Sequence, residues 1–131
     1  IQLHRQRRPI HWELIESDGN LSLELSRINI SKNILIDSLG GFVSRHLDKP
    51  EKLWQDISNC LVLSINEREG TTVLVIEECG WSVVPETKLG CLFRDRLGLV
   101  SQTLQRYSNQ SWLVLQGIAI DLKDKGILIH E

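Results

Sequence analysis

Apolar residues recur along this chain at two spacings, and together these spacings predict alternating strands and helices. Short unbroken apolar runs predict strands at residues 33–38 and 73–76. A longer run at residues 112–120, with a glycine inside it, predicts a further strand. Apolar positions at three- and four-residue steps predict helices over about residues 51–68 and from just after Pro85 to about Tyr107. This alternation favours an α/β fold with a mostly parallel sheet.

Shorter signals fill the intervals between these elements. Residues 1–8 suit the last turns of a helix that Pro9 ends, and residues 12–15 suggest a brief strand. Asn20 is the expected cap of a short helix over about residues 21–28, although the apolar spacing there is also compatible with a strand. Gly70 is expected to follow the helix at 51–68 as its C′ residue, and the tail to residue 131 suggests a small edge hairpin.

Acidic residues follow two of the predicted strands. Asp37 closes the first, and Glu77 and Glu78 follow an apolar run whose composition predicts burial on both faces. Parallel neighbours bring their carboxyl ends to one crevice, so these carboxylates are candidates for a metal-bound phosphate, a ribose or general-base chemistry. The alternative is that they form turns or are simply solvated.

Composition narrows the classes of function. A length of 131 residues fits a single domain, and a net charge of -2 argues against a dedicated nucleic-acid or anionic-membrane binder. The three cysteines show no CxxC spacing and indicate reduced thiols in a cytoplasmic protein. The four histidines lack zinc-ligand spacing, so no protein-bound metal is expected, and no apolar run approaches the roughly 20 residues of a membrane span.

A histidine beside several arginines suits attack on phosphorus. His4 lies next to Arg5, with Arg7 and Arg8 close behind; the imidazole could act as a nucleophile while the guanidiniums neutralise phosphates. The alternative is an exposed histidine in a basic helix end. No GxxxxGK[ST] occurs in the 131 residues, so no visible motif cradles a triphosphate.

Adjacent charges also occur within the second long helix, at Arg94 and Asp95. Neighbouring residues on a helix point in different directions, so no direct pairing is implied. One of the two could face the crevice.

Three segments resemble one family. They are IQLHRQRRPIHWELIE, ILIDSLGGFVS and EECGWSVVPETKLGCLFRDRLGLVSQTL, with WLVLQGIAIDLK similar to a closing strand. In this order and spacing they resemble the bifunctional adenosylcobinamide kinase/adenosylcobinamide-phosphate guanylyltransferase of cobalamin biosynthesis. The resemblance covers nearly the whole chain, and its third segment is the most specific.

The resemblance implies a P-loop NTPase (RecA-like) three-layer sandwich, often a homotrimer. It implies phosphorylation of adenosylcobinamide and transfer of GMP from GTP through a GMP-histidine intermediate, with ATP, GTP and Mg²⁺ as the small molecules involved. His4 falls on the guanylylated histidine. The positions that fall on GTP contacts are Arg5, Gln6, Arg7, Arg8, Glu16 and Asp37.

The sequence also departs from the family pattern. Glu77 stands where the family often has Asn, and the other departures are Ser82, Cys91 and Ser101. The family's amino-terminal strand and P-loop have no counterpart, so residues 1–131 are expected to form the carboxyl-terminal part of the domain and to show no turnover alone. A degenerate, non-catalytic nucleotide- or subunit-binding remnant is the alternative, and a kinase-like domain with another substrate is a third reading.

Overall fold

The computed structural model describes residues 9–81 and 83–129. The described part of the chain alternates helices with short strands, as the apolar spacing predicts. In chain order the elements are α2 (Leu21–Arg27), β1 (Ile34–Asp37), α3 (Leu39–Ser44), α4 (Glu51–Asn66), β2 (Thr72–Val75), α5 (Lys88–Tyr107), β3 (Trp112–Leu115), β4 (Ile118–Asp121) and α6 (Leu122–Lys125).

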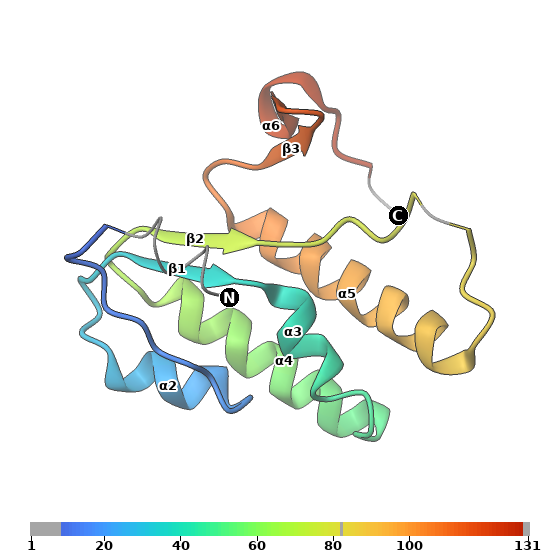
Figure 1. Ribbon diagram of the computed structural model, residues 1–131, viewed down its shortest axis with the longest axis horizontal. Coiled ribbons are helices and arrows are strands. Elements are labelled where there is room, and N and C mark those ends of the chain that lie inside the picture. Colours follow the sequence, from blue (N-terminus) through green and yellow to red (C-terminus); the bar gives the residue numbers. More distant parts are fainter. Residues whose placement is uncertain (1–8, 82, 130–131) are drawn as a thin grey trace.

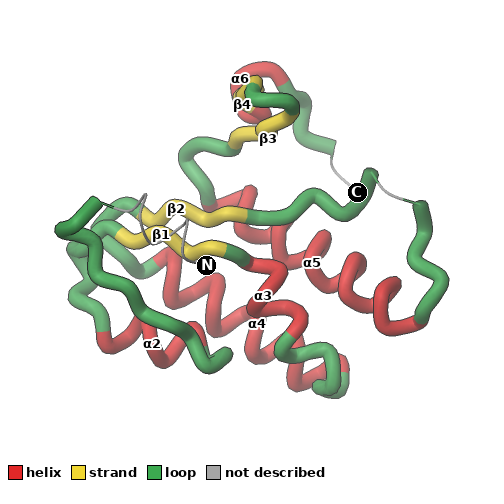
Figure 2. The backbone as a smooth tube through the Cα atoms, viewed as in Figure 1, coloured by secondary structure: helices red, strands yellow, loops and turns green. Residues whose placement is uncertain are grey.

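Strands β1 and β2 form a parallel pair that lies over the helices. Their register matches Ile34 with Thr72 and Asp37 with Val75, so both carboxyl ends reach the same edge. Figure 1 shows α2, α3 and α4 on one side of this pair, whereas β3 and α6 stand apart on the other side, where the chain leaves the end of the orange helix α5. Figure 2 shows the same separation, and the two yellow strand pairs form separate sheets. Within the described residues the architecture is thus mixed α/β, with a two-stranded parallel sheet packed on helices.

The core lies between the parallel pair and the helices. Its buried side chains are Leu25, Leu39, Phe42, Val43, Trp54, Leu61, Val62, Leu97, Val100 and Leu104. They come from α2, α3, α4 and α5, and Ile34, Ile36 and Leu74 from the strands pack against them. Because α3 and the ends of β1 and β2 share this core, packing fixes where the strand-end acids lie.

The apolar run after Gly70 is half exposed, which corrects the expectation of burial on both faces. Burial alternates along β2, with Thr72 and Leu74 half-buried and Val73 and Val75 exposed. The strand is also one residue earlier than the apolar run suggests. No described element covers its outer face, so the run of β-branched residues alone could not distinguish one-sided from two-sided burial.

Side-chain caps account for the starts of two helices, and the close approach of another backbone segment accounts for the glycine at position 70. The Asn20 side chain accepts from Leu23 N–H, as expected, and Thr87 accepts from Gly90 N–H at the start of α5. Helix α4 ends at Asn66 with Glu67 as its C-cap, so Gly70 is not its C′ residue. A Cβ on Gly70 would lie 2.3 Å from the Lys32 carbonyl oxygen, and this backbone approach is what requires glycine there.

The glycine in the last apolar run turns the chain. The expected continuous strand over residues 112–120 is a hairpin in which β3 and β4 pair antiparallel, with Leu115 opposite Ile118. Gln116 and Gly117 both have positive φ, 51° and 79°, the signature of a two-residue type I′ turn. The tail then forms α6 and not the expected edge hairpin.

The expected strand at residues 12–15 does not form. These residues lie in an irregular segment that opens with a turn in which Trp12 N–H donates to the Pro9 carbonyl. Trp12, Leu14 and Ile15 are about half exposed. A short alternating segment becomes a strand only beside a partner strand, and none pairs with it in the described chain.

Candidate functional site at the carboxyl edge of the parallel strands

The carboxyl ends of β1 and β2 bring the predicted acids together. Asp37 is the last residue of β1 and is exposed at this edge. Glu77 follows two residues after Val75, the register partner of Asp37. The predicted convergence of two strand-end acids is therefore confirmed.

Glu77 joins the end of β2 to the start of α3. One carboxylate oxygen accepts from Ser38 Oγ, and the other accepts from the backbone N–H of Gly40 at 2.9 Å. Ser38 is the N-cap of α3 and does not cap the helix with its own side chain. We call this arrangement of Glu77, Ser38 and Gly40 the clasp.

The clasp favours the ionised form of Glu77. Partial burial acts to raise the pKa of its carboxyl, but hydrogen bonds from Ser38, from its own backbone and from Gly40 outweigh that effect and lower the pKa from its ordinary value of 4.5. Glu77 therefore accepts these hydrogen bonds as a carboxylate, whereas Asp37 presents its carboxylate at the same edge.

Glu78 and Cys79 do not add chemistry here. Glu78 accepts from the backbone N–H of Gly80 at 2.6 Å, so it forms the local turn that the alternative reading allowed. Burial, followed by the negative charges of Glu77 and Glu78, raises the pKa of the Cys79 thiol above its ordinary 9.0. A thiol of this kind stays protonated and is a poor nucleophile.

The charged residues of α5 serve different purposes. Arg94 donates to Asp95 Oδ1 from Nε at 3.0 Å and from Nη2 at 2.8 Å, so the adjacent residues pair although their spacing does not imply it. The long arginine side chain can reach the carboxylate of its neighbour even though their Cβ atoms point in different directions. Arg96, which the sequence analysis did not single out, is the buried member of the group, at 3% exposure.

Arg96 holds the turn between α3 and α4. Its guanidinium donates to the carbonyl oxygens of His46 and Lys49, both at 2.8 Å, and to Glu51 Oε2 at 3.2 Å. It also lies 5.1 Å from the centre of the Trp54 ring. These contacts make Arg96 part of the scaffold.

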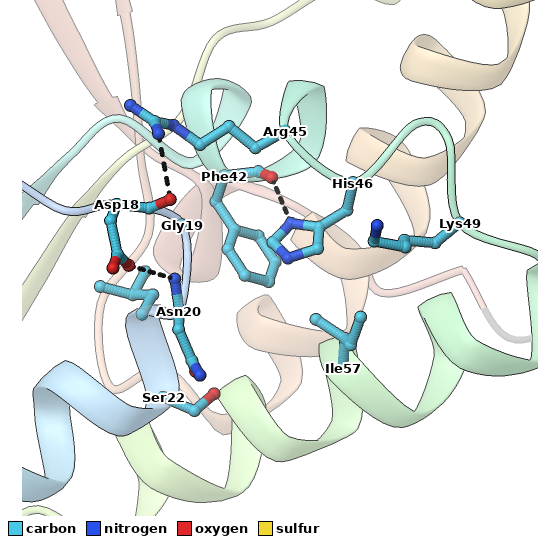
Figure 3. A pocket seen from close by; sticks show the side chains of 10 residues that line it. Asp18, Gly19, Asn20, Ser22, Phe42, Arg45, His46, Lys49 and Ile57 are labelled. Atoms are coloured by element: carbon cyan, nitrogen blue, oxygen red, sulfur yellow. Dashed lines mark hydrogen bonds between the residues drawn. The ribbon is translucent and has the colours of Figure 1, made fainter.

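A pocket of about 230 Å³ lies at the other end of α3, away from Asp37. Figure 3 shows its wall, where Arg45 donates to the Asp18 carbonyl at 3.1 Å and His46 Nδ1 contacts the Phe42 carbonyl at 2.8 Å. The neighbouring Lys49 is paired with Asp48. Each of these polar groups has a local structural partner, so the strand-end acids remain the stronger candidate site.

The remaining predicted site residues are distributed unevenly. Glu16 lies in the irregular segment before α2, exposed and outside the helices and strands. His4, Arg5, Gln6, Arg7 and Arg8 lie outside the described residues. Asp37 is the predicted site residue that a strand of the parallel pair positions.

Sequence reasoning missed the partners of Glu77. Ser38 and Gly40 carry no charge and form no motif, and their signal is only that they follow Asp37 at the start of a helix. Glu77, read from the sequence as a candidate ligand or base, is instead tied to this helix start. The family departure at position 77 is thus where the clasp forms.

The described residues provide no ready-made metal cage. Across residues 9–81 and 83–129, no group of three or more His, Cys, Asp or Glu side chains could hold a metal ion. An exposed carboxylate at this edge suits Mg²⁺ that is held mainly by phosphate oxygens, since Mg²⁺ commonly uses one or two carboxylates plus substrate phosphates.

A membrane-spanning helix is not found in the part of the chain that the structure describes.

Comparison with known proteins supports the family resemblance over most of the chain. Residues 1–122 match the family model described as cobinamide kinase / cobinamide phosphate guanyltransferase. The chain is 33% identical over 139 aligned residues to the bifunctional adenosylcobalamin biosynthesis protein CobU of Escherichia coli strain K12, with 94% of this chain and 76% of that protein covered.

Two further relatives carry similar names. CobU of Salmonella typhimurium is 30% identical, with 94% of this chain and 76% of that protein covered. The bifunctional protein CobP of Pseudomonas aeruginosa is 29% identical, with 94% and 72% covered. A kinase and guanyltransferase family uses nucleotides, which fits an acidic edge at paired strand ends. The chain belongs to the cobinamide kinase / cobinamide phosphate guanyltransferase family.

Proposed function

We propose that this chain carries the guanylyltransferase chemistry of cobalamin biosynthesis, transferring GMP from GTP to adenosylcobinamide phosphate, with phosphorylation of adenosylcobinamide as the partner reaction. The proposal is supported above all by the family match, which extends over residues 1–122 and so includes both His4 and Asp37. Asp37 at the carboxyl edge of two parallel strands is consistent with a nucleotide site there.

His4 is the proposed nucleophile. A ring nitrogen attacks the α-phosphorus of GTP, the bond to the β-phosphate oxygen breaks, and pyrophosphate leaves. A phosphate oxygen of the substrate then attacks the same phosphorus, and the histidine nitrogen leaves with its electron pair restored. The covalent intermediate divides one difficult displacement into two easier ones. Arg5, Gln6, Arg7, Arg8 and Glu16 are the proposed contacts to GTP.

Asp37 is the proposed contact for a Mg²⁺–nucleotide. Its exposed carboxylate offers a hard oxygen ligand, and Mg²⁺ bound there with the nucleotide phosphates would offset negative charge. Glu77 accepts hydrogen bonds from Ser38 and Gly40, and we assign the ligand role to Asp37.

The broader assignments belong to the same proposal. Residues 1–131 would form the carboxyl-terminal part of a P-loop kinase/guanylyltransferase domain that assembles as a trimer in the cytoplasm. The in-frame coding sequence before Ile1 tests the domain assignment. A GxxxxGK[ST] motif encoded there supports it, whereas a stop codon or a genuine start at that point favours a non-catalytic remnant.

The chemistry is tested with GTP labelled at its α-phosphate. The protein expressed from its complete reading frame should acquire acid-labile label, and His4→Ala should abolish it. His11→Ala is the matched control and should label normally. Absence of label, or label that persists in His4→Ala, would remove His4 from the mechanism.

A further inference from the structure

The clasp has a place in the fold that suggests a role beyond stability. It connects Glu77, two residues beyond the end of β2, to Ser38 and Gly40, which lie one and three residues beyond Asp37 at the end of β1, across the edge where the nucleotide site is proposed. Ser38 is covalently joined to Asp37, so whatever fixes Ser38 also restricts the backbone from which the Asp37 carboxylate projects.

We infer that Glu77 is a positioning residue: through Ser38 and Gly40 it holds Asp37 in the orientation that binds a Mg²⁺–nucleotide. This inference rests on the proposed function, since it deepens the role given there to Asp37. It assigns Glu77 no direct contact with the metal; the hydrogen bonds that its two carboxylate oxygens accept tie it to the start of α3.

Three features of the described structure support the inference. The contacts join residues 37 to 39 positions apart in sequence, so they are tertiary contacts and not local turns. The Glu77 carboxylate lies directly against the backbone of Gly40, where an added Cβ would be 2.4 Å from Glu77 Oε2. Leu39 and Gly40 are buried, so the clasped segment rests directly on the core.

The neighbouring Glu78 supplies a matched comparison. It carries the same charge one residue later, yet it accepts only from Gly80 N–H within its own turn. A role that depends on negative charge near the edge predicts similar effects for both glutamates. A role that depends on the clasp predicts an effect for Glu77 alone.

The choice of substitution separates positioning from direct ligation. Glu77→Gln can keep both contacts, since its amide oxygen accepts from Gly40 N–H while its amide nitrogen donates to Ser38 Oγ. Glu77→Ala loses both. A direct Mg²⁺ ligand would be lost in either variant, so the glutamine variant discriminates between the two roles.

The test measures the Mg²⁺-dependent dissociation constant for GTP with the protein from its complete reading frame. Removing a group that orients a ligand typically costs 10- to 100-fold in affinity, so Glu77→Ala should weaken binding roughly tenfold or more. Glu77→Gln should stay within about threefold of wild type, and Glu78→Ala should bind like wild type.

A double-mutant cycle with Asp37→Asn separates positioning from a general structural defect. If Glu77 acts through Asp37, Glu77→Ala adds no further loss of GTP affinity in the Asp37→Asn background. Independent losses that multiply would overturn the inference. So would equal losses in Glu77→Gln and Glu77→Ala.

Hydrogen exchange at the Gly40 amide reports on the clasp without any nucleotide. Exchange should accelerate in Glu77→Ala and stay slow in Glu77→Gln, while amides of α4 are unchanged. Unchanged Gly40 exchange in Glu77→Ala would refute the clasp itself. A wild-type protein that binds no Mg²⁺–GTP would overturn the proposed function and the positioning role together, whereas normal GTP binding by Glu77→Ala would overturn only the positioning role.

Discussion

Two charged side chains, Arg96 and Glu77, each join separate elements of this chain through hydrogen bonds, but they do so in different surroundings. Arg96 is buried and donates to two carbonyl oxygens of the turn between α3 and α4. Glu77 lies at the open carboxyl edge and accepts from the start of α3. Both contact the flanks of the same short helix, one from its carboxyl end and one from its amino end.

The difference shows how surroundings assign a role to a polar group. Water can replace the partners of an exposed carboxylate at little cost, so such a group contributes little net stability. A buried guanidinium has no such replacement, and its removal leaves acceptors without donors. Arg96 therefore belongs to the fold, and Glu77 belongs to the geometry of the candidate site.

The largest expected effect is on stability, in Arg96→Ala. The change removes the Arg96 donor from the Lys49 carbonyl and leaves the His46 carbonyl with the Lys49 N–H, and it removes the packing of the arginine stem near Trp54. We expect a loss of about 3 kcal/mol in the free energy of unfolding, measured by urea titration. Arg106→Ala, in the exposed last turn of α5, is the control, and a loss below about 1 kcal/mol in Arg96→Ala would contradict this role for Arg96.

Arg96→Lys should show an intermediate loss. Lysine keeps the charge and an apolar stem, but an ammonium cannot reproduce the planar fork that reaches two carbonyls and Glu51 together. We expect a loss of about 1.5 kcal/mol in the same urea titration. Stability equal to wild type would mean that the charge, and not the fork, accounts for the contribution of Arg96.

Glu77→Ala should affect stability less than either change at Arg96. Its two contacts lie at a solvated edge, where water can take the place of the carboxylate. We expect a loss of about 1 kcal/mol or less in the free energy of unfolding. A loss as large as that of Arg96→Ala would place Glu77 in the scaffold and end the contrast between the two side chains.

The smallest expected effect is a pH dependence. The clasp lowers the pKa of Glu77 below 4.5, so its contribution to stability is present above about that pH and is lost as the pH falls through the lowered pKa. Between about pH 5 and about pH 3, wild type should therefore lose slightly more Tm than Glu77→Gln. Glu78→Gln should follow wild type, and parallel profiles for wild type and Glu77→Gln would show that the clasp does not favour the charged form.

The sequence predicts the elements of this fold better than their environment. Helix periodicity identifies α4 and α5, because a buried stripe recurs visibly along sixteen and more residues. The apolar runs do not distinguish one-sided from two-sided burial of β2, since that depends on which elements cover the sheet. They also place Gly117 within a strand, although positive φ angles at Gln116 and Gly117 make the segment a hairpin.

Only part of the candidate site could be predicted from the sequence. Acids at the ends of two strands are visible in the sequence, and parallel pairing brings them to one edge as expected. The sequence does not show that Glu77 accepts hydrogen bonds from Ser38 and Gly40 while Asp37 stays exposed. Ser38 and Gly40 contribute through their place at the start of α3 and not through their residue type. Arg96 escaped notice for the same reason: only the tertiary fold shows that it is buried while Arg94 is not.

The contrast between the two side chains is tested most directly by the affinity for Mg²⁺–GTP of Arg96→Lys and Glu77→Ala, both compared with wild type at a temperature where all three are folded. Glu77→Ala should bind roughly tenfold or more weakly, and Arg96→Lys should bind like wild type despite its lower stability. Equal weakening in both variants, or weakening in Arg96→Lys alone, would contradict the division of roles.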